Sequence, residues 1–446
     1  MRRRRSGQSA RSPLWRGHSV CRATIGLRES PTDQEIRVTE RAASPALDAD
    51  VVIAGAGLSG LSLAVALLAA GLPDGGRIVL VDPRETLSGA DRTWCFFDLV
   101  PHAFESAITH RWSRWRVRNG VHEVTRSAPG IAYCRIPGER FYEVALERLA
   151  AAGGRVEIMH GVTVENLTSR GTHVDVHTGA GVLRARLAMD SRPPPLAHAA
   201  DEGKDVHLLQ HFRGRIVRSK DPVFDVDVAT LMDFDVSQAD GIHFIYVLPL
   251  DARTALVEST FFTGRLLPDD VYETAIESWL ARWHPGVVFE TISHERGVIP
   301  MTTKPFDAWP SPRVVRIGTA GGHVKPSSGY AFLAVQRFVC EFAPRVVAAL
   351  HGGGLAEPPA VRSARTTALD TIFLSYLRSC PDRAPDTFYR LFERVPPGVL
   401  ARFLSDSGTL ADDLAVMRKS DSPRLALEAI RATPLVRRRN LKTGRG

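Results

Sequence analysis

The chain has 446 residues, of which 44% are hydrophobic and 24% are charged. These proportions are typical of soluble globular proteins and exclude a disordered or collagen-like chain, and the length allows about two or three domains. The five cysteines are widely scattered and never form a C-x-x-C pair. This pattern argues against a disulfide framework and a zinc site, and it favours a reducing compartment.

The net charge of +8 comes from the two ends of the chain. Residues 1–30 contribute +7 and residues 431–446 contribute +6, whereas the body between them carries −5. A nucleic-acid-binding domain concentrates positive charge on a folded face, so we expect no nucleic-acid partner. Basic ends suit an anionic lipid surface, and solvated ends without a role are the alternative.

The start of the chain shows no secretory signal peptide, because no apolar segment follows the first arginines. It resembles an organelle transit peptide, and an over-long start codon choice explains it equally well. The predicted folded elements therefore begin after about residue 45.

The first predicted elements form a nucleotide-binding unit. The apolar run 51–54 predicts a strand that ends in the turn GAGLSG at 55–60, and the Ala/Leu-rich segment 61–70 predicts a helix. A second apolar run, 78–81, ends on Asp82. Strand, glycine turn, helix and distal acid together form a dinucleotide-binding fingerprint. The glycines also argue against a membrane span in the uncharged stretch 51–73.

Each residue of this fingerprint has an expected role. Gly55 allows the tight turn, Gly57 lets backbone N–H groups approach a pyrophosphate, and Gly60 lets the helix pack closely on the strand. The helix N-terminus then faces the phosphates. Asp82 is expected to accept hydrogen bonds from the ribose hydroxyls of the adenosine half.

The following segments predict a two-domain protein with split elements. The sequence predicts a helix at 141–152, strands at 156–159 and 161–164, and a hairpin of 173–177 with 182–187. Alternating patterns predict sheet strands at 206–218, 242–248 and 254–263. A strand at 313–318 then leads to a second glycine turn and to a helix that ends near Leu350, and a helical pattern follows Arg362 with interruptions at Pro381, Pro385 and 396–397.

The second glycine turn indicates FAD. Gly318, Gly321 and Gly322 are expected to lie along the ribityl and pyrophosphate groups of the cofactor. Flavin hydroxylases usually place Gly-Asp at this turn, whereas this chain has Thr319. That departure weakens a monooxygenase interpretation.

The body of the chain, about 48–430, resembles the bacterial lycopene cyclases through seven short motifs in family order. They are DRTWCF at 91–96, MDSR at 189–192, QHFRG at 210–214, FIYVLP at 244–249, VEST at 257–260, GVIPMT at 297–302 and PSSGY at 326–330. The resemblance implies bound FAD, NADPH or NADH as its reductant, a membrane-dissolved carotene such as lycopene as substrate, and no net redox change. It also implies that Arg92 and Thr93 bind the cofactor.

Cyclisation of a ψ-end group is acid–base chemistry. A proton is added to the terminal double bond, the carbocation closes the ring, and a proton leaves an adjacent ring carbon. A carboxylic acid whose pKa is raised by an apolar pocket suits this step, and the negative charge of a reduced flavin stabilises the cation. By resemblance Glu258 is the first catalytic candidate and Asp233 the second. Solvent-facing or turn positions are the alternatives for both.

Three further expectations concern the site. The family often has a glutamate where this chain has Ile216. If that acid is essential in the family, its role in this chain must have moved to another residue, or the activity is altered. The histidines near the motifs show no metal-ligand spacing, and we expect no metal. The aromatic residues of the motifs supply either an apolar tunnel or ordinary core packing.

The expected fold class is α/β, with a Rossmann-like FAD-binding domain (a doubly wound parallel sheet), a split β-rich substrate domain and a helical C-terminal region. The expected ranges are a basic N-terminal extension at 1–47, the first part of the FAD-binding domain at 48–200, the β-rich substrate domain at 201–305, the return of the FAD-binding domain at 306–350, a helical membrane-facing region at 351–430 and a basic tail at 431–446.

The expected function is therefore lycopene β-cyclase, an isomerase of carotenoid biosynthesis. The expected location is cytoplasmic and peripheral on the membrane lipid surface, because no other segment approaches the ~20 apolar residues that a span requires. Two alternatives remain. One is a flavin-dependent oxidoreductase, either a prenyl reductase or a monooxygenase, and the other is a non-catalytic flavoprotein or lipid-docking partner.

Overall fold

The structure is a computed structural model that describes residues 46–89, 92–194, 205–420, 425 and 427–432. The expected N-terminal extension, most of the expected basic tail and Asp91 of the first family motif lie outside the described residues.

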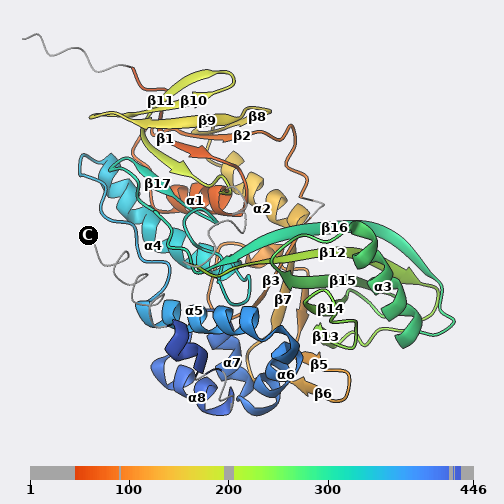
Figure 1. The fold of residues 1–446 in the computed structure, drawn as a ribbon. Helices are drawn as coiled ribbons and strands as arrows, with labels where there is room; N and C mark the ends of the chain where they lie inside the picture. The colour runs from red at the N-terminus through yellow and green to blue at the C-terminus, as the bar shows by residue number, and fades with distance from the viewer. Residues whose placement is uncertain (1–45, 90–91, 195–204, 421–424, 426, 433–446) are drawn as a thin grey trace, which may run out of the picture. The chain divides into compact units, whose positions relative to one another are not determined.

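The first sheet carries the nucleotide-binding unit (Figure 1). Its strands are β1 (Ala49–Ala54), β2 (Ile78–Asp82), β8 (Val156–His160), β9 (Val164–Ser169), β10 (Val174–Thr178), β11 (Gly181–Asp190) and β17 (Val314–Arg316). The pairs β8–β2, β2–β1, β1–β11 and β11–β17 are parallel, whereas β9, β10 and β11 form an antiparallel meander. Because β17 follows β16 by chain order yet pairs with β11, the chain returns to this sheet after building the second one.

Helices cover one face of the first sheet. They are α1 (Leu58–Ala69), α2 (Gly138–Ala150) and α4 (Phe332–Leu350). Val51 and Ile53 of β1 join their apolar side chains in one core cluster. Val52 and Ala54 point to the opposite face and pack with side chains of β9 and β10. Both faces of β1 are thus buried, which explains its continuous apolar run.

The second sheet has the order β16-β12-β15-β14-β13-β5-β6. Its strands are β5 (Arg114–Arg118), β6 (Glu123–Arg126), β12 (His207–Ser219), β13 (Val228–Asp233), β14 (Ile242–Pro249), β15 (Thr254–Thr263) and β16 (Phe289–Thr302). All its neighbours pair antiparallel except β13 and β5. The range 48–200 is therefore not confined to the first sheet, because its β5 and β6 extend the second.

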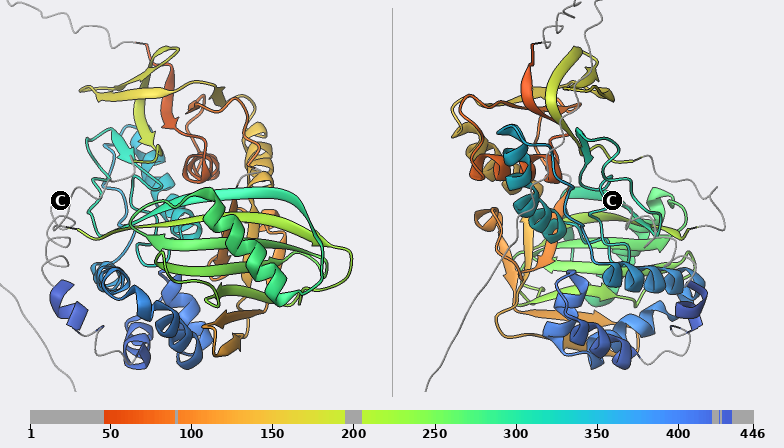
Figure 2. Two further views of the ribbon diagram at one scale, coloured as in Figure 1. Left: turned by 45° about the vertical axis from the view of Figure 1, so that its right-hand side comes forward. Right: turned by 90° about the vertical axis from the view of Figure 1, so that its left-hand side faces the viewer.

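Both faces of the second sheet are covered, as the two views of Figure 2 show. Helix α3 (Asp269–Trp283) lies on one face, and its Ile276 and Trp279 pack on Val257 of β15. The other face packs with the C-terminal helices α5 (Ala364–Ser379), α6 (Ala384–Arg394), α7 (Pro397–Leu404) and α8 (Leu410–Ser420). All ten residues of β15 are buried for this reason.

A small third sheet connects the two larger ones. It consists of β3 (Thr93–Phe97), β7 (Tyr133–Pro137) and β4 (His110–Trp112), with the short 3-10 helix η1 (Glu105–Ala107) beside it. Its Phe96 belongs to the core under α4, whereas its Phe97 belongs to the core of the second sheet. Adjacent residues of β3 thus face different cores, as alternation along a strand requires.

Two differences from the predicted elements have clear causes. Pro385 does not interrupt a helix but lies in the first turn of α6, where its missing N–H has no partner to lose. The predicted strand at 161–164 is a turn through Gly161, at φ +68°, and β9 begins only at Val164. A second 3-10 helix, η2 (Pro381–Arg383), precedes α6.

Candidate functional site

The turn after β1 forms a cradle of backbone atoms. Gly55 adopts a φ of +99°, and a Cβ there would lie 2.5 Å from Oγ of Ser191. A Cβ on Gly60 would lie 2.0 Å from the carbonyl oxygen of Gly55, so α1 can approach the turn only through glycine. Gly57 lines the cavity described below, and a Cβ there would meet no atom within 4 Å. The open backbone at Gly57 fits a bound pyrophosphate.

Asp82 lies at the end of β2, beside this cradle. Its carboxylate accepts the backbone N–H of Ala56 at 2.7 Å and Nε of Arg84 at 2.8 Å. Burial raises the pKa of Asp82, but the hydrogen bonds from Arg84 and Ala56 outweigh burial and leave the pKa below its ordinary value. Asp82 is therefore a buried, ionised acceptor. Arg84, which the sequence did not single out, also lines the cavity.

The second glycine turn, which follows β17, lies beside the first turn of α1. Gly318 adopts a φ of +64°, and a Cβ there would lie 2.7 Å from Oγ of Ser59 in the first turn of α1. Gly318 lines the cavity, whereas Gly321 and Gly322 are not lining residues. A Cβ on Gly321 would lie 2.4 Å from the carbonyl oxygen of Arg316, so this glycine permits the turn itself.

A cavity of about 710 Å³ extends from the cradle to the second sheet. Arg92 and Thr93 line it where β3 begins. The cavity walls formed by the second sheet are mostly apolar. Side chains from α6 and from the last residue of α7 also line the cavity. These wall residues are Phe212, Leu231, Met232, Phe244, Leu256, Phe262, Phe388, Phe392 and Leu404. The cavity thus joins a polar cradle to an apolar chamber.

Glu258 of β15 points into this chamber, and its side chain has the same orientation as those of Leu256, Thr260 and Phe262. The residue is only 7% exposed, and Oε1 has no hydrogen-bond partner. Burial raises the pKa of Glu258 well above its ordinary value, and the charge of neighbouring Glu295 raises it further. This carboxyl group can therefore hold a proton at neutral pH.

Asp233, the second catalytic candidate, does not reach the chamber. It lies at the end of β13 on the α3 side of the sheet, where its Oδ2 accepts hydrogen bonds from Arg118 at 2.9 Å and Trp279 at 3.0 Å. Asp235 follows the strand and forms an ion pair with Arg282 of the same helix. Both carboxylates therefore attach α3 to the sheet, and the cavity instead receives Met232.

The comparison with known families decides the family of this chain. The model of the family described as lycopene cyclase protein matches residues 50–431. The chain belongs to the lycopene cyclase family. A lycopene beta-cyclase of Paracoccus sp. is 27% identical over 419 residues, a match that covers 86% of this chain and 97% of the relative.

Solved structures show that this lycopene cyclase family member has the fold of known flavoproteins. A flavoprotein/dehydrogenase from Cytophaga hutchinsonii aligns with a TM-score of 0.57 at 14% identity, over 86% of this chain and 98% of that one. The flavin-dependent monooxygenase PieE, solved in complex with FAD and substrate, aligns with a TM-score of 0.53 at 13% identity, over 88% and 72% of the two chains. The predicted α/β flavoprotein fold is confirmed.

The sequence did not predict the hydrogen bonds between the polar groups around Glu258 in this lycopene cyclase family member, although Tyr246 and Tyr330 lie in the motifs at 244–249 and 326–330. Tyr246 lies beside Glu258 in register and donates a hydrogen bond to Tyr133 at 2.9 Å, and Tyr133 lies 3.3 Å from the hydroxyl of Tyr330. Glu295 of β16 also lines the chamber. It stands two residues before the motif at 297–302, and only the pairing of β16 with β12 brings it to the site.

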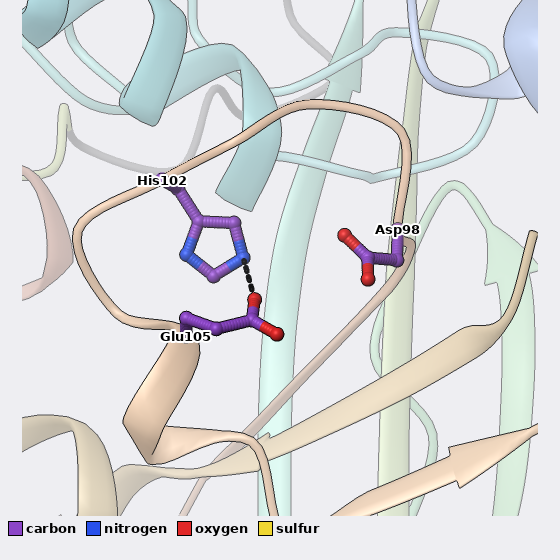
Figure 3. Close-up of side chains that lie close together, drawn as sticks. All are labelled: Asp98, His102 and Glu105. Carbon is purple, nitrogen blue, oxygen red and sulfur yellow. Dashed lines mark ion pairs between the residues drawn. The ribbon is translucent and has the colours of Figure 1, made fainter.

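Three side chains that could bind a metal ion gather outside the chamber, those of Asp98, His102 and Glu105 (Figure 3). Arg111 already forms ion pairs with both carboxylates. His102 accepts the backbone N–H of Phe104 at Nδ1, so its neutral ring carries the proton on Nε2, which faces Glu105. That tautomer offers no lone pair to a metal at Nε2, and we assign no metal to this cluster.

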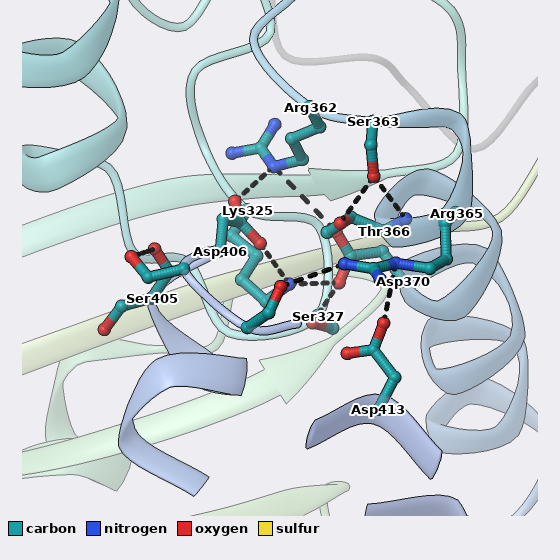
Figure 4. A network of polar contacts seen from close by, with 12 residues as sticks. Lys325, Ser327, Arg362, Ser363, Arg365, Thr366, Asp370, Ser405, Asp406 and Asp413 are labelled. Carbon is teal, nitrogen blue, oxygen red and sulfur yellow. Dashed lines mark hydrogen bonds and ion pairs between the residues drawn. The ribbon is translucent and has the colours of Figure 1, made fainter. Parts of the chain in front are cut away.

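A buried ionic network supports the loop that follows the second glycine turn (Figure 4). The ammonium group of Lys325 lies 2.6 Å from Asp370 of α5 and 2.6 Å from Asp406, which follows α7. Burial alone would raise the pKa of Asp406, but Lys325 and Arg362 lower it below its ordinary value. Ser327, a lining residue of the cavity, donates a hydrogen bond to the same Asp370 oxygen. The network therefore ties the C-terminal helices to the cavity wall.

Within the described part of the chain, no helix combines the length and the apolar character needed to cross a membrane.

Proposed function

We propose that this chain is a lycopene β-cyclase that converts ψ-end groups of lycopene to β rings without net oxidation or reduction. The observation that carries the proposal is the placement of Glu258: a buried carboxyl group whose pKa burial raises, facing an apolar chamber that continues into a glycine cradle. A protonated acid without competing water is what a hydrocarbon double bond requires. Membership of the lycopene cyclase family supports the same activity.

The residues of the chamber have separate roles in this proposal. Glu258 donates the proton to the terminal double bond, and the apolar walls exclude water that would otherwise capture the carbocation. Phe244 and Phe262 present aromatic side chains on the same wall, where a ring face stabilises positive charge. Asp233 is not proposed as a catalytic residue, because α3 holds it on the other face of the sheet.

The cradle residues fit FAD as the cofactor. Gly57 and the N-terminus of α1 would hold the pyrophosphate, Asp82 with Arg84 would bind the adenosine half, and Gly318 would lie along the ribityl chain. Bound reduced flavin supplies negative charge that stabilises the cation without passing electrons to it. NADPH or NADH is the proposed reductant of the flavin. Arg92 and Thr93 line the same cavity, as cofactor-binding residues would.

The chain is proposed to attach peripherally to the cytoplasmic membrane surface and to take its substrate from that membrane. Leu410, Leu414 and Met417 of α8 are 59%, 46% and 55% exposed and share one helical face at i, i+4 and i+7. Arg418 and Lys419 are exposed at the end of the same helix. An exposed apolar stripe beside basic residues suits an anionic lipid surface. Helix α8 packs on α6 and α7, whose side chains reach the chamber.

Flotation with liposomes tests this surface. The Leu414→Asp and Met417→Asp double variant should lose most binding to anionic vesicles, whereas Val121→Asp, at an exposed valine of the β5–β6 turn, should retain it. Equal binding by both variants would place the membrane contact elsewhere.

Expression of the full chain in a lycopene-accumulating bacterium tests the activity. Cyclic products of unchanged mass, identified by chromatography and mass spectrometry, are expected. Products with added oxygen or hydrogen would instead indicate an oxidoreductase. Glu258→Gln should retain FAD and lose cyclisation by at least about 100-fold, as removal of a general acid does. A fully active Glu258→Gln variant would exclude Glu258 from the mechanism.

A further inference from the structure

Glu258 and Glu295 occupy one row across three neighbouring strands. Gly214 of β12 pairs with Glu258 of β15 on one side and with Glu295 of β16 on the other. Residues that share a row in adjacent strands point to the same face of a sheet. Both glutamates therefore project into the chamber from either side of a glycine, and both are lining residues.

The missing side chain of Gly214 brings the two carboxyl groups together. A Cβ at this position would lie 2.7 Å from Cγ and 3.1 Å from Oε1 of Glu258, and 3.2 Å from Cγ of Glu295. The two side chains thus lean over the glycine from opposite sides. No positive φ explains this glycine, so the reason for it is space.

The two carboxyl groups have different surroundings. Oε2 of Glu295 accepts a hydrogen bond from the hydroxyl of Thr93 at 2.8 Å, and Glu295 is only partly buried. Glu258 is nearly fully buried, and its Oε1 is buried beside Gly214 without a hydrogen-bond partner. Two carboxyl groups this close share a proton more readily than they carry two charges, and the proton favours the drier site.

The other groups that face Glu258 leave this asymmetry in place. The positive charge of Arg135 of β7 lowers the pKa of Glu258, but it offsets only part of the increase caused by burial and by Glu295. Cys95 of β3 and Tyr246 of β14 are neutral near pH 7, because burial raises the pKa of both groups. Gly214 of β12 contributes no side chain. The Glu258 pKa remains raised after all these influences are combined.

We propose that Glu258 and Glu295 form a carboxyl pair that shares one proton, in which Glu295 is the positioning residue that keeps the proton on Glu258. This inference rests on the proposed cyclisation. It assigns to Glu295 the second acidic role that the position of Ile216 left open, because the neighbouring strand supplies the carboxylate.

The pair accounts for the protons of one cyclisation. The Glu258 proton passes to the terminal double bond, whose π electrons form the new C–H bond. The resulting cation takes the π electrons of the next double bond into a C–C bond and closes the ring. The adjacent ring carbon then loses a proton to the Glu258 carboxylate, and its C–H electrons become the ring double bond. The pair regains its single proton, and nothing is oxidised or reduced.

Infrared titration of the carboxyl carbonyl stretch tests the pair in the FAD-loaded full chain without substrate. Wild-type protein should show a carboxyl group that titrates well above the ordinary range, and Glu258→Gln should remove that signal. In Glu295→Gln the same signal should titrate at least about one pH unit lower, because the neighbouring negative charge is gone. Glu290→Gln, on an exposed position of the same strand, is the matched control and should leave the signal unmoved.

Activity gives the second readout. In Glu295→Gln, the pH above which the cyclisation rate declines should fall by the same interval as the Glu258 carboxyl signal. Between the Glu258 pKa values of the variant and the wild type, the variant should be up to about tenfold slower, and its rate should recover at lower pH. A Glu258 signal unmoved in Glu295→Gln overturns the pair, whatever the reaction. A moved signal in a protein that makes no cyclic product upholds the pair and overturns the proposed cyclisation. Should Glu295→Gln not fold, Thr93→Val perturbs the same carboxylate and should also move the signal, and an unmoved signal there overturns the pair.

Discussion

Asp233 and Glu258 lie on opposite faces of the same sheet. Asp233 faces α3 and binds Arg118 and Trp279, whereas Glu258 faces the chamber. Their different partners separate a structural carboxylate from a proton donor. Asp233 is fully buried but satisfied by a cation and an indole N–H, whereas Oε1 of Glu258 is buried without a partner.

Replacement of Asp233 should therefore affect stability and spare chemistry. Asp233→Asn weakens the hydrogen bond to Trp279 and leaves Arg118 with Glu123 as its carboxylate partner. We expect a loss of about 1–3 kcal/mol in the free energy of unfolding, measured by urea denaturation. The cyclisation rate per folded molecule should stay within about twofold of wild type. A large loss of rate with unchanged stability would return Asp233 to the list of catalytic candidates.

The space above Gly214 is equally specific. Gly214→Ala places a methyl group 2.7 Å from Cγ of Glu258 and forces the two glutamates apart. We expect about 1–3 kcal/mol of destabilisation from overpacking and a marked loss of cyclisation, with FAD still bound. Gly264→Ala, just after β15, is the control because its Cβ meets no atom within 4 Å. Wild-type activity in Gly214→Ala would show that the geometry above the glycine is not needed.

Local patterns in the sequence predicted the elements that carry their own signal. The strand at 254–263 and the fingerprint around Gly55 were found because apolar runs and glycine spacing are local properties. Strands β5 and β6 were not predicted. RWRVR of β5 does alternate arginines with the buried Trp115 and Val117, but both strands are short and join the second sheet only at its far edge.

The candidate site could be predicted only in part for the same reason. Glu258 lies in a recognisable motif, but its orientation depends on which face of β15 meets the cavity. Glu295 depends on strand pairing between segments about 80 residues apart, which no local pattern encodes. Asp233 was misplaced because the register of β13 shifts between Thr230 and Asp233, so that Leu231 and Met232 both line the chamber whereas Asp233 faces α3.

The buried network around Lys325 predicts strong coupling between its members. Lys325→Met leaves Asp370 and Asp406 buried, with Arg362 as the cation that still contacts both carboxylates. Removal of one partner from a buried ionic cluster costs about 3–5 kcal/mol, so we expect a loss of that size in urea denaturation. The Lys325→Met, Asp370→Asn double variant should recover more than half of it. Additive losses in the double variant would show that the two groups are not coupled.

The proton on Glu258 should make the protein less stable at high pH. Because burial and Glu295 raise its pKa above the ordinary value of 4.5, the folded chain keeps a proton that the unfolded chain has released. Folding then takes up a proton, and the free energy of unfolding falls as pH rises from about 4.5 towards the folded-state pKa, by at most about 1.4 kcal/mol per pH unit. Glu258→Gln removes this dependence.

The thermal midpoint of Glu258→Gln should match that of wild type near pH 4 and exceed it increasingly from pH 6 to 8, while the midpoint of Glu290→Gln should follow wild type throughout. A difference between Glu258→Gln and wild type that is constant across this range would mean that Glu258 is ionised in the folded protein, and the acid required for cyclisation would then have to be another group.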